Sequence, residues 1–268
     1  MMGWVMVYFL LLSFMLGGFP LALGSGTTMS VDAFSQADAE ELWEKAIAAK
    51  GGRERLHAIR SVLITKDFKY WVTPFKRARN LHVTLVVLPD KSWSWDDYRP
   101  GKLGLRVKMI NPERNYNWLT YPNDPKSPRR LTHTIEPNLP FFHLREMIES
   151  PWLQIVPFKA TSQRIKSKTF HVVYVRAGDW VAKYYLDTKT FLLARIEFVT
   201  LSDMEKTWET YQFFDYVEVD GIQVPSKYRV GDSAKIPRVY QFNVEYDPGI
   251  FERPPTVEAG PDAWRVKR

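Results

Sequence analysis

The feature that most constrains this chain is a two-residue hydrophobic period that returns in one segment after another from Ser61 onward. Leu81, Val83 and Leu85 alternate with His82 and Thr84, for example. Such alternation is typical of β-strands with one apolar and one polar face. Similar runs occupy residues 105–109, 170–174, 192–198, 222–230 and 240–246.

Turn-forming residues separate these runs at short intervals, among them Pro89-Asp90, Asn111-Pro112 and Asp220-Gly221. Consecutive short strands joined by such turns form antiparallel sheets. The pattern gives about eleven strands. We therefore predict a mainly β (α+β) fold with one highly curved antiparallel sheet or a partial barrel.

Only two sizeable helices are predicted to cover the concave face of that sheet. The first spans Gln36–Lys50 and ends at Gly51-Gly52, and a short further helix follows at Arg53–Arg60. The mid-chain helix spans Asn138–Ser150, with Pro140 in its first turn and Pro151 just after its end. Two helices cover ten or more strands poorly, so the space left is either filled by the 10 Trp, 13 Tyr and 16 Phe or remains an apolar cavity.

The first 24 residues carry no charged side chain and end in Ala22-Leu23-Gly24, which is typical of a cleaved secretory signal peptide. An uncleaved inner-membrane anchor over residues 1–24 is the alternative. We predict a flexible linker at 25–35, one domain at 36–254 and a basic C-terminal tail at 255–268. Export indicates a periplasmic protein.

Composition and motifs exclude several kinds of chemistry. The chain has no Cys, so disulfides, Cys nucleophiles and Cys-bound zinc are excluded. No nucleophile elbow is present. His143, Glu146 and Glu149 share a predicted helix face, but one His and two carboxylates more often form a solvated surface than a metal site.

Two other charged patterns are each consistent with a functional site or with an ordinary solvated surface. Asp96 and Asp97 follow a Trp-Ser-Trp run and are reminiscent of glycosidase carboxylates, but neighbours on a strand point to opposite faces. The net charge of +7 and clusters such as Lys76-Arg77-Ala78-Arg79 could contact nucleic acid. Solvated faces or attraction to anionic lipid headgroups fit an exported protein better.

Three segments of the second half resemble the periplasmic outer-membrane lipoprotein-sorting proteins of the LolA-like/LolB-like family. They are residues 182–190, with an Asp187-Thr188 turn, residues 214–225, with Val219-Asp220-Gly221 and Val224-Pro225, and residues 242–254, which close on Phe251 and Pro254. The resemblance covers roughly residues 38–254. It implies a single large curved antiparallel sheet that forms an unclosed half-barrel of about eleven strands. Helices plug the concave face of this half-barrel, and the apolar cavity between takes acyl chains. The proline-rich basic loop at 122–130 departs from that pattern.

These observations favour a non-enzymatic carrier or chaperone that binds acyl chains of lipoproteins or other lipids and aids their transport to the outer membrane. We expect no cofactor, no metal and no nucleic acid, a monomer, and an inner-membrane exporter or outer-membrane acceptor as partner. An envelope sensor or accessory module working with an exporter is the main alternative, and a glycosidase-type enzyme is a third.

The predicted lipid groove is lined by apolar residues from the alternating runs. They are Leu81, Val83, Leu85, Leu105, Val107, Met109, Leu192, Ile196, Phe198, Tyr240, Phe242 and Val244. The predicted lid is the mid-chain helix, through Phe141, Leu144, Met147 and Ile148, whose spacing forms one apolar stripe. A fixed core helix is the alternative for this segment.

Overall fold

A computed structural model describes most of the chain after residue 34. The described residues are 35–73, 76–97, 99, 104–114, 116–122, 124, 126–130, 144–148, 155–177, 180–200, 203–256, 258 and 260–266. The predicted signal peptide and nearly all of the predicted linker lie outside these residues, so both remain predictions.

Helix α1 spans Gln36–Lys50, as predicted. Ser35 caps it, because its hydroxyl accepts from the Asp38 backbone N–H while the Asp38 carboxylate accepts from the Ser35 N–H. At its other end Gly51 has a φ of 128°, which strongly favours glycine. The short helix α2 then spans Arg53–His57.

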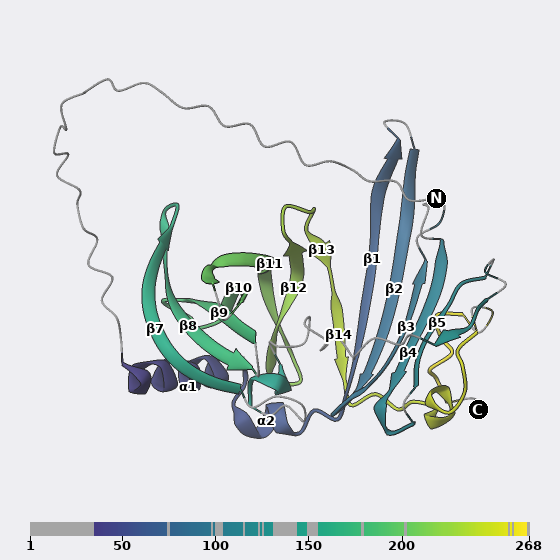
Figure 1. The fold of residues 1–268 in the computed structure, drawn as a ribbon, viewed down its shortest axis with the longest axis horizontal. Helices are drawn as coiled ribbons and strands as arrows, with labels where there is room; N and C mark the ends of the chain where they lie inside the picture. Colours follow the sequence, from purple (N-terminus) through teal and green to yellow (C-terminus); the bar gives the residue numbers. More distant parts are fainter. Residues whose placement is uncertain are drawn as a thin grey trace, which may run out of the picture. The chain divides into compact units, whose positions relative to one another are not determined.

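The mainly β, unclosed antiparallel class is confirmed, but the strands form two seven-stranded sheets (Figure 1). The first sheet has the order β14-β1-β2-β3-β4-β5-β6. Its strands are β1 (Ser61–Thr73), β2 (Lys76–Val87), β3 (Lys91–Asp97), β4 (Leu105–Asn111), β5 (Tyr116–Thr120), β6 (Arg129–Arg130) and β14 (Val239–Phe242).

The second sheet has the order β13-β12-β11-β10-β9-β8-β7. Its strands are β7 (Ile155–Ile165), β8 (Lys168–Ala177), β9 (Trp180–Asp187), β10 (Leu193–Thr200), β11 (Asp203–Val219), β12 (Ile222–Val230) and β13 (Ile236–Pro237). Single 3-10 turns lie at η1 (Pro112–Arg114), η3 (Arg145–Met147) and η4 (Pro248–Phe251).

The two sheets meet at Arg238, and this corrects the expectation of one sheet. Ile236 and Pro237 pair with β12, whereas Val239–Phe242 pair with β1. Arg238 is the single residue between these two strands, and its N–H donates to the Ser226 carbonyl at 2.7 Å. The chain therefore changes sheets within one extended segment, which the hydrophobic period cannot reveal because the alternation continues through it.

Two buried clusters lie on opposite faces of the first sheet. The shared core joins α1 and the second sheet to Val62, Ile64, Val86, Tyr240 and Phe242 of the first sheet. The C-terminal core occupies the other face, where Leu85, Trp93 and Met109 are covered by Phe251 and Trp264. On β1, Leu63 belongs to the C-terminal core while its neighbours Val62 and Ile64 belong to the shared core, as strand alternation requires.

The final segment is an integral part of this second cluster. Trp264 is buried, the Thr120 hydroxyl donates to the Pro255 carbonyl at 2.8 Å, and the Asp247 N–H donates to the Trp264 carbonyl at 2.8 Å. The chain therefore packs onto the sheet beyond the boundary predicted at residue 254.

The mid-chain segment is described only at residues 144–148, where it forms the single 3-10 turn η3 rather than an α-helix. The preceding residues of the predicted helix, with Phe141 and His143, and the residues after Ile148 lie outside the described residues.

Candidate functional site

The structure divides the predicted groove residues between the two clusters. Ile196, Phe198, Tyr240 and Phe242 belong to the shared core. Val83, Leu85, Val107 and Met109 are buried in the C-terminal core, against which Leu81, Leu105 and Val244 also pack. Leu192 is partly buried and belongs to neither cluster.

Asn243 explains why Val244 leaves the face occupied by Tyr240 and Phe242. Its φ of 51° is left-handed and breaks the two-residue period at the end of β14. The Asn243 side chain is held there because its amide oxygen accepts from the Arg60 N–H at 2.8 Å. Phe242 is buried and Glu245 is exposed.

The described lid residues are closely packed. Leu144 and Met147 are buried in the shared core and Ile148 packs against it. The Trp43 indole N–H of α1 donates to the Met147 carbonyl at 3.0 Å. The segment is therefore packed against α1 in this conformation.

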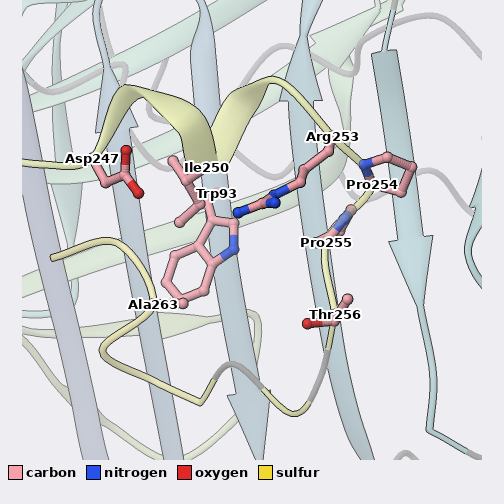
Figure 2. Close-up of a pocket in the computed structure, with 8 residues that line it drawn as sticks. All are labelled: Trp93, Asp247, Ile250, Arg253, Pro254, Pro255, Thr256 and Ala263. Carbon is pink, nitrogen blue, oxygen red and sulfur yellow. The ribbon is translucent and has the colours of Figure 1, made fainter. Parts of the chain in front are cut away.

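A pocket of about 380 Å³ opens between the C-terminal segment and β3 (Figure 2). Its walls combine the Trp93 indole with apolar and a few polar side chains. The lining residues are Trp93, Asp247, Ile250, Arg253, Pro254, Pro255, Thr256 and Ala263. This volume lies within the range of small-molecule sites in proteins.

The pocket has a charged group beside an apolar floor. Figure 2 shows the Arg253 side chain pointing toward Trp93. The Asp247 carboxylate accepts from the Gly249 N–H at 2.9 Å and so caps η4, which fixes one wall. An exposed cation above an indole and prolines suits an amphiphile with an apolar chain and an anionic end.

A second candidate site is a polar cluster at the junction of the sheets. We call it the seam cluster, and it comprises Lys66, His82, Asp96, Arg106, Tyr228 and Arg238. The first four stand directly opposite one another across β1, β2, β3 and β4. They share a face with Val62 and Ile64 of the shared core.

Asp96 links two members of this row. Its carboxylate contacts Nδ1 of His82 and accepts from Nε of Arg106 at 2.6 Å. The Thr84 hydroxyl lies 2.6 Å from Nε2 of His82. These partners fit a neutral imidazole that donates from Nδ1 to Asp96 and accepts at Nε2 from Thr84.

Arg238 and Lys66 approach the same tyrosine. The guanidinium carbon of Arg238 lies 3.3 Å from the centroid of the Tyr228 ring, and the Lys66 ammonium lies 5.3 Å from it. Arg238 also donates to the Tyr240 hydroxyl at 3.1 Å. Its own exposed fraction is only 3%.

Burial and the excess of cations shift the pKa values of this cluster. Burial lowers the pKa of His82 well below its usual range, and Lys66, Arg106 and Arg238 act in the same direction. Burial also lowers the pKa of Lys66 to about 8. For Tyr228, burial raises the pKa, but the charges of Lys66 and Arg238 outweigh it and the net shift is downward.

The glycosidase-type pair is separated as expected. Asp96 is buried in the seam cluster, whereas Asp97 is partly exposed on the other face and pairs with Arg99 at 2.7 Å. His143, Glu149 and the side chain of Glu146 lie outside the described residues. Within the described part, no three His, Asp or Glu side chains gather as metal ligands do.

The sequence reasoning assigned His82, Thr84 and Arg106 to polar strand faces but did not bring them together. The signal that could have done so is the register, because these residues occupy the same parity on consecutive antiparallel strands. Tyr228 and Arg238 could not be added in this way, since they come from the other side of the sheet junction.

Among the helices of the described chain, none has the length and apolar character needed to cross a bilayer.

Comparison with known proteins finds similarities of fold but none of sequence family. No protein-family model matches the chain, and no curated protein matches its sequence. The chain is similar to a LolA superfamily protein from Nitrosomonas europaea, with 12% identity, a TM-score of 0.49 and coverage of 80% of this chain and 96% of that chain.

Two further solved structures are similar over the same extent. A DUF1329 family protein from Desulfovibrio piger has 10% identity, a TM-score of 0.46 and coverage of 80% and 96%. A putative outer membrane lipoprotein-sorting protein domain from Vibrio parahaemolyticus has 11% identity, a TM-score of 0.46 and coverage of 81% and 97%. These similarities concern the fold alone.

Proposed function

We propose that the protein is a periplasmic carrier that binds the acyl chain of a lipoprotein or another lipid. The observation that carries the proposal is the pocket beneath the C-terminal segment, with its indole and proline walls and an arginine pointing over its floor. The resemblance of residues 182–254 to lipoprotein-sorting proteins and the signal-like N-terminus support the same reading.

Binding by such a carrier needs burial rather than catalysis. Each methylene that leaves water contributes about 0.8 kcal/mol, so burial of a long acyl chain can offset the entropy lost on association without any catalytic group. Arg253 is placed to pair with an anionic end of the same molecule, which would orient the chain toward Trp93.

The test is titration of the purified mature protein with a fluorescent fatty acid, together with native mass spectrometry for co-purified lipid. Ala263→Trp places a large side chain in the pocket and should weaken binding of the probe about tenfold or more. Ala234→Trp adds the same bulk in an exposed turn and should leave binding unchanged.

Two results would contradict the proposal. If the wild-type protein binds no fatty acid and carries no lipid, the carrier function is wrong. If Ala263→Trp folds normally and binds the probe as tightly as wild type, the chain binds elsewhere, and the groove residues predicted from the sequence become the next candidates.

A further inference from the structure

The seam cluster holds more cations than its carboxylate can neutralise. Asp96 pairs with Arg106, whereas no described carboxylate forms an ion pair with Lys66 or Arg238, so two positive charges are left over. The contacts of His82 with Asp96 and Thr84 fit a neutral imidazole, which adds no charge to the cluster. Arg238 is the buried one of these two cations, and a buried charge without a counter-charge is costly.

Arg238 shows where the missing partner would lie. It is buried, its Nη1 contacts the Tyr240 hydroxyl, and its guanidinium stacks on Tyr228. Its Nε–H has no hydrogen-bond partner among the described residues. The Glu209 carboxylate on β11 accepts from the Tyr211 hydroxyl and is not an ion-pair partner of Arg238.

We propose that the seam cluster binds a phosphate group, held by Lys66, Arg238 and Arg106. A phosphate carries up to two negative charges, which matches the excess, and its oxygens accept from several donors at once. Guanidinium and ammonium groups are the donors that recognise phosphate in proteins. The Nε–H of Arg238 would gain a charged acceptor, and Arg106 would bridge Asp96 and the ligand.

The phosphate can be inorganic or the headgroup of a phospholipid. Only the headgroup source rests on the proposed carrier function. Arg106 and Lys66 are partly exposed while Asp96 and Arg238 are not, so a ligand would enter from the side of the first sheet's middle strands.

The experiment is calorimetric titration of the full mature protein with inorganic phosphate, and with dihexanoyl phosphatidic acid below its micelle concentration. Dihexanoylglycerol, which has the same acyl chains but no phosphate, is the uncharged control ligand. Lys66→Met should weaken phosphate binding about tenfold or more, because it removes one charged donor but keeps the aliphatic stem. Lys69→Met removes the same charge from an exposed position on the opposite face of β1 and should change binding less than about twofold.

Arg238→Lys provides a second variant that keeps the charge of Arg238 and removes its Nε–H. We expect weaker phosphate binding with an unchanged circular dichroism spectrum. Tighter binding of phosphatidic acid than of inorganic phosphate, with no binding of the glycerol compound, would identify a lipid headgroup. Equal binding of the two phosphates would identify free phosphate.

Absence of binding of either phosphate to wild type, or equal effects of Lys66→Met and Lys69→Met, would overturn the proposal. The fatty-acid titration on the same samples separates this outcome from failure of the carrier function. If wild type binds phosphate but no fatty acid, the phosphate site is supported and the carrier function is contradicted. If wild type binds fatty acid but no phosphate, the carrier function is supported and the phosphate site is contradicted.

Discussion

The guanidinium of Arg238 stacks on the ring of Tyr228, with 3.3 Å between the guanidinium carbon and the ring centroid. Arg238 is the residue at which the chain leaves the second sheet for the first, and Tyr228 lies on β12 of the second sheet. The contact therefore ties the strand that changes sheets to the sheet that it leaves. Lys66 of β1 approaches the same ring, so the junction is built around one phenol and two cations.

Asp96 should be far more important to stability than its neighbour. Asp96→Asn leaves Arg106 and His82 without their carboxylate in a buried site, and we expect a loss of about 3–5 kcal/mol in the free energy of unfolding. Asp97→Asn breaks only the pair with the exposed Arg99 and should cost about 1 kcal/mol or less. Urea denaturation of both variants checks this, and equal losses would contradict the assignment of Asp96 to a buried network.

Gly51 should tolerate no side chain. A Cβ built there would lie 2.5 Å from the Gly221 carbonyl oxygen, and φ is 128°. Gly51→Ala should therefore destabilise the protein by more than about 3 kcal/mol. Gly52→Ala is the control, since its φ of 88° is also unfavourable but no atom lies within 4 Å of the added carbon. If the two variants lose the same free energy of unfolding in chemical denaturation, the Asp220-Gly221 turn must move away from the carbon added at residue 51.

Lys50 should make stability depend on pH. Its ammonium is buried, donates to the Gln223 carbonyl at 2.8 Å, and burial lowers its pKa from 10.5 to about 7. Between these values only the unfolded chain holds the proton, so the contribution of Lys50 to stability falls as pH falls from about 10.5 to about 7.

Lys50→Met removes that dependence. The difference in unfolding free energy between wild type and variant should change by about 1.4 kcal/mol per pH unit within the window, in favour of wild type at higher pH. Denaturation curves at pH 7, 8, 9 and 10 measure it. A constant difference across this range would mean that Lys50 keeps its ordinary pKa.

The sequence predicted local features well and long-range ones less well. Helix α1 was predicted with its observed bounds, because the apolar spacing and the ending at Gly51-Gly52 are local signals. The alternation of side chains along β2 and β4 was also predicted, since a two-residue period is visible in the sequence alone. The split into two sheets was not, because Arg238 changes strand partners without any break in the pattern.

The candidate sites were also missed where they depend on long-range contacts. Polar residues such as His82 were assigned to a wet face, but that face is buried where the second sheet supplies Tyr228. The C-terminal residues were assigned to a tail from their charge and position, although Trp264 is buried against the first sheet. Both depend on contacts between residues far apart in the chain, which no local pattern encodes.

The segment at Leu144–Ile148 can be tested as a movable cover. Trp43→Phe removes the hydrogen bond to the Met147 carbonyl and should lower stability by about 1 kcal/mol. If an acyl chain enters the shared core instead of the pocket beneath the C-terminal segment, this segment must open, and the same change should then raise fatty-acid affinity about fivefold. Tyr185→Phe removes a buried hydrogen bond to Glu197 elsewhere and should leave affinity unchanged. Lower stability with unchanged affinity in Trp43→Phe would show that the segment is fixed core.

The C-terminal segment should stabilise the first sheet as a covering layer. Trp264 is 6% exposed and packs with Phe251 over the cluster around Leu85, Trp93 and Met109. Trp264→Ala should cost about 3–5 kcal/mol, because it removes a large buried ring and leaves a cavity above the sheet. Val266→Ala, at a side chain that is 46% exposed, should cost about 0.5 kcal/mol or less.

Urea denaturation of the two variants gives both values. Binding of the fluorescent fatty acid should fall in Trp264→Ala alone, because its neighbour Ala263 lines the pocket. If Trp264→Ala is as stable as Val266→Ala, residues 255–266 are a tail after all, and the pocket beneath them loses its outer wall.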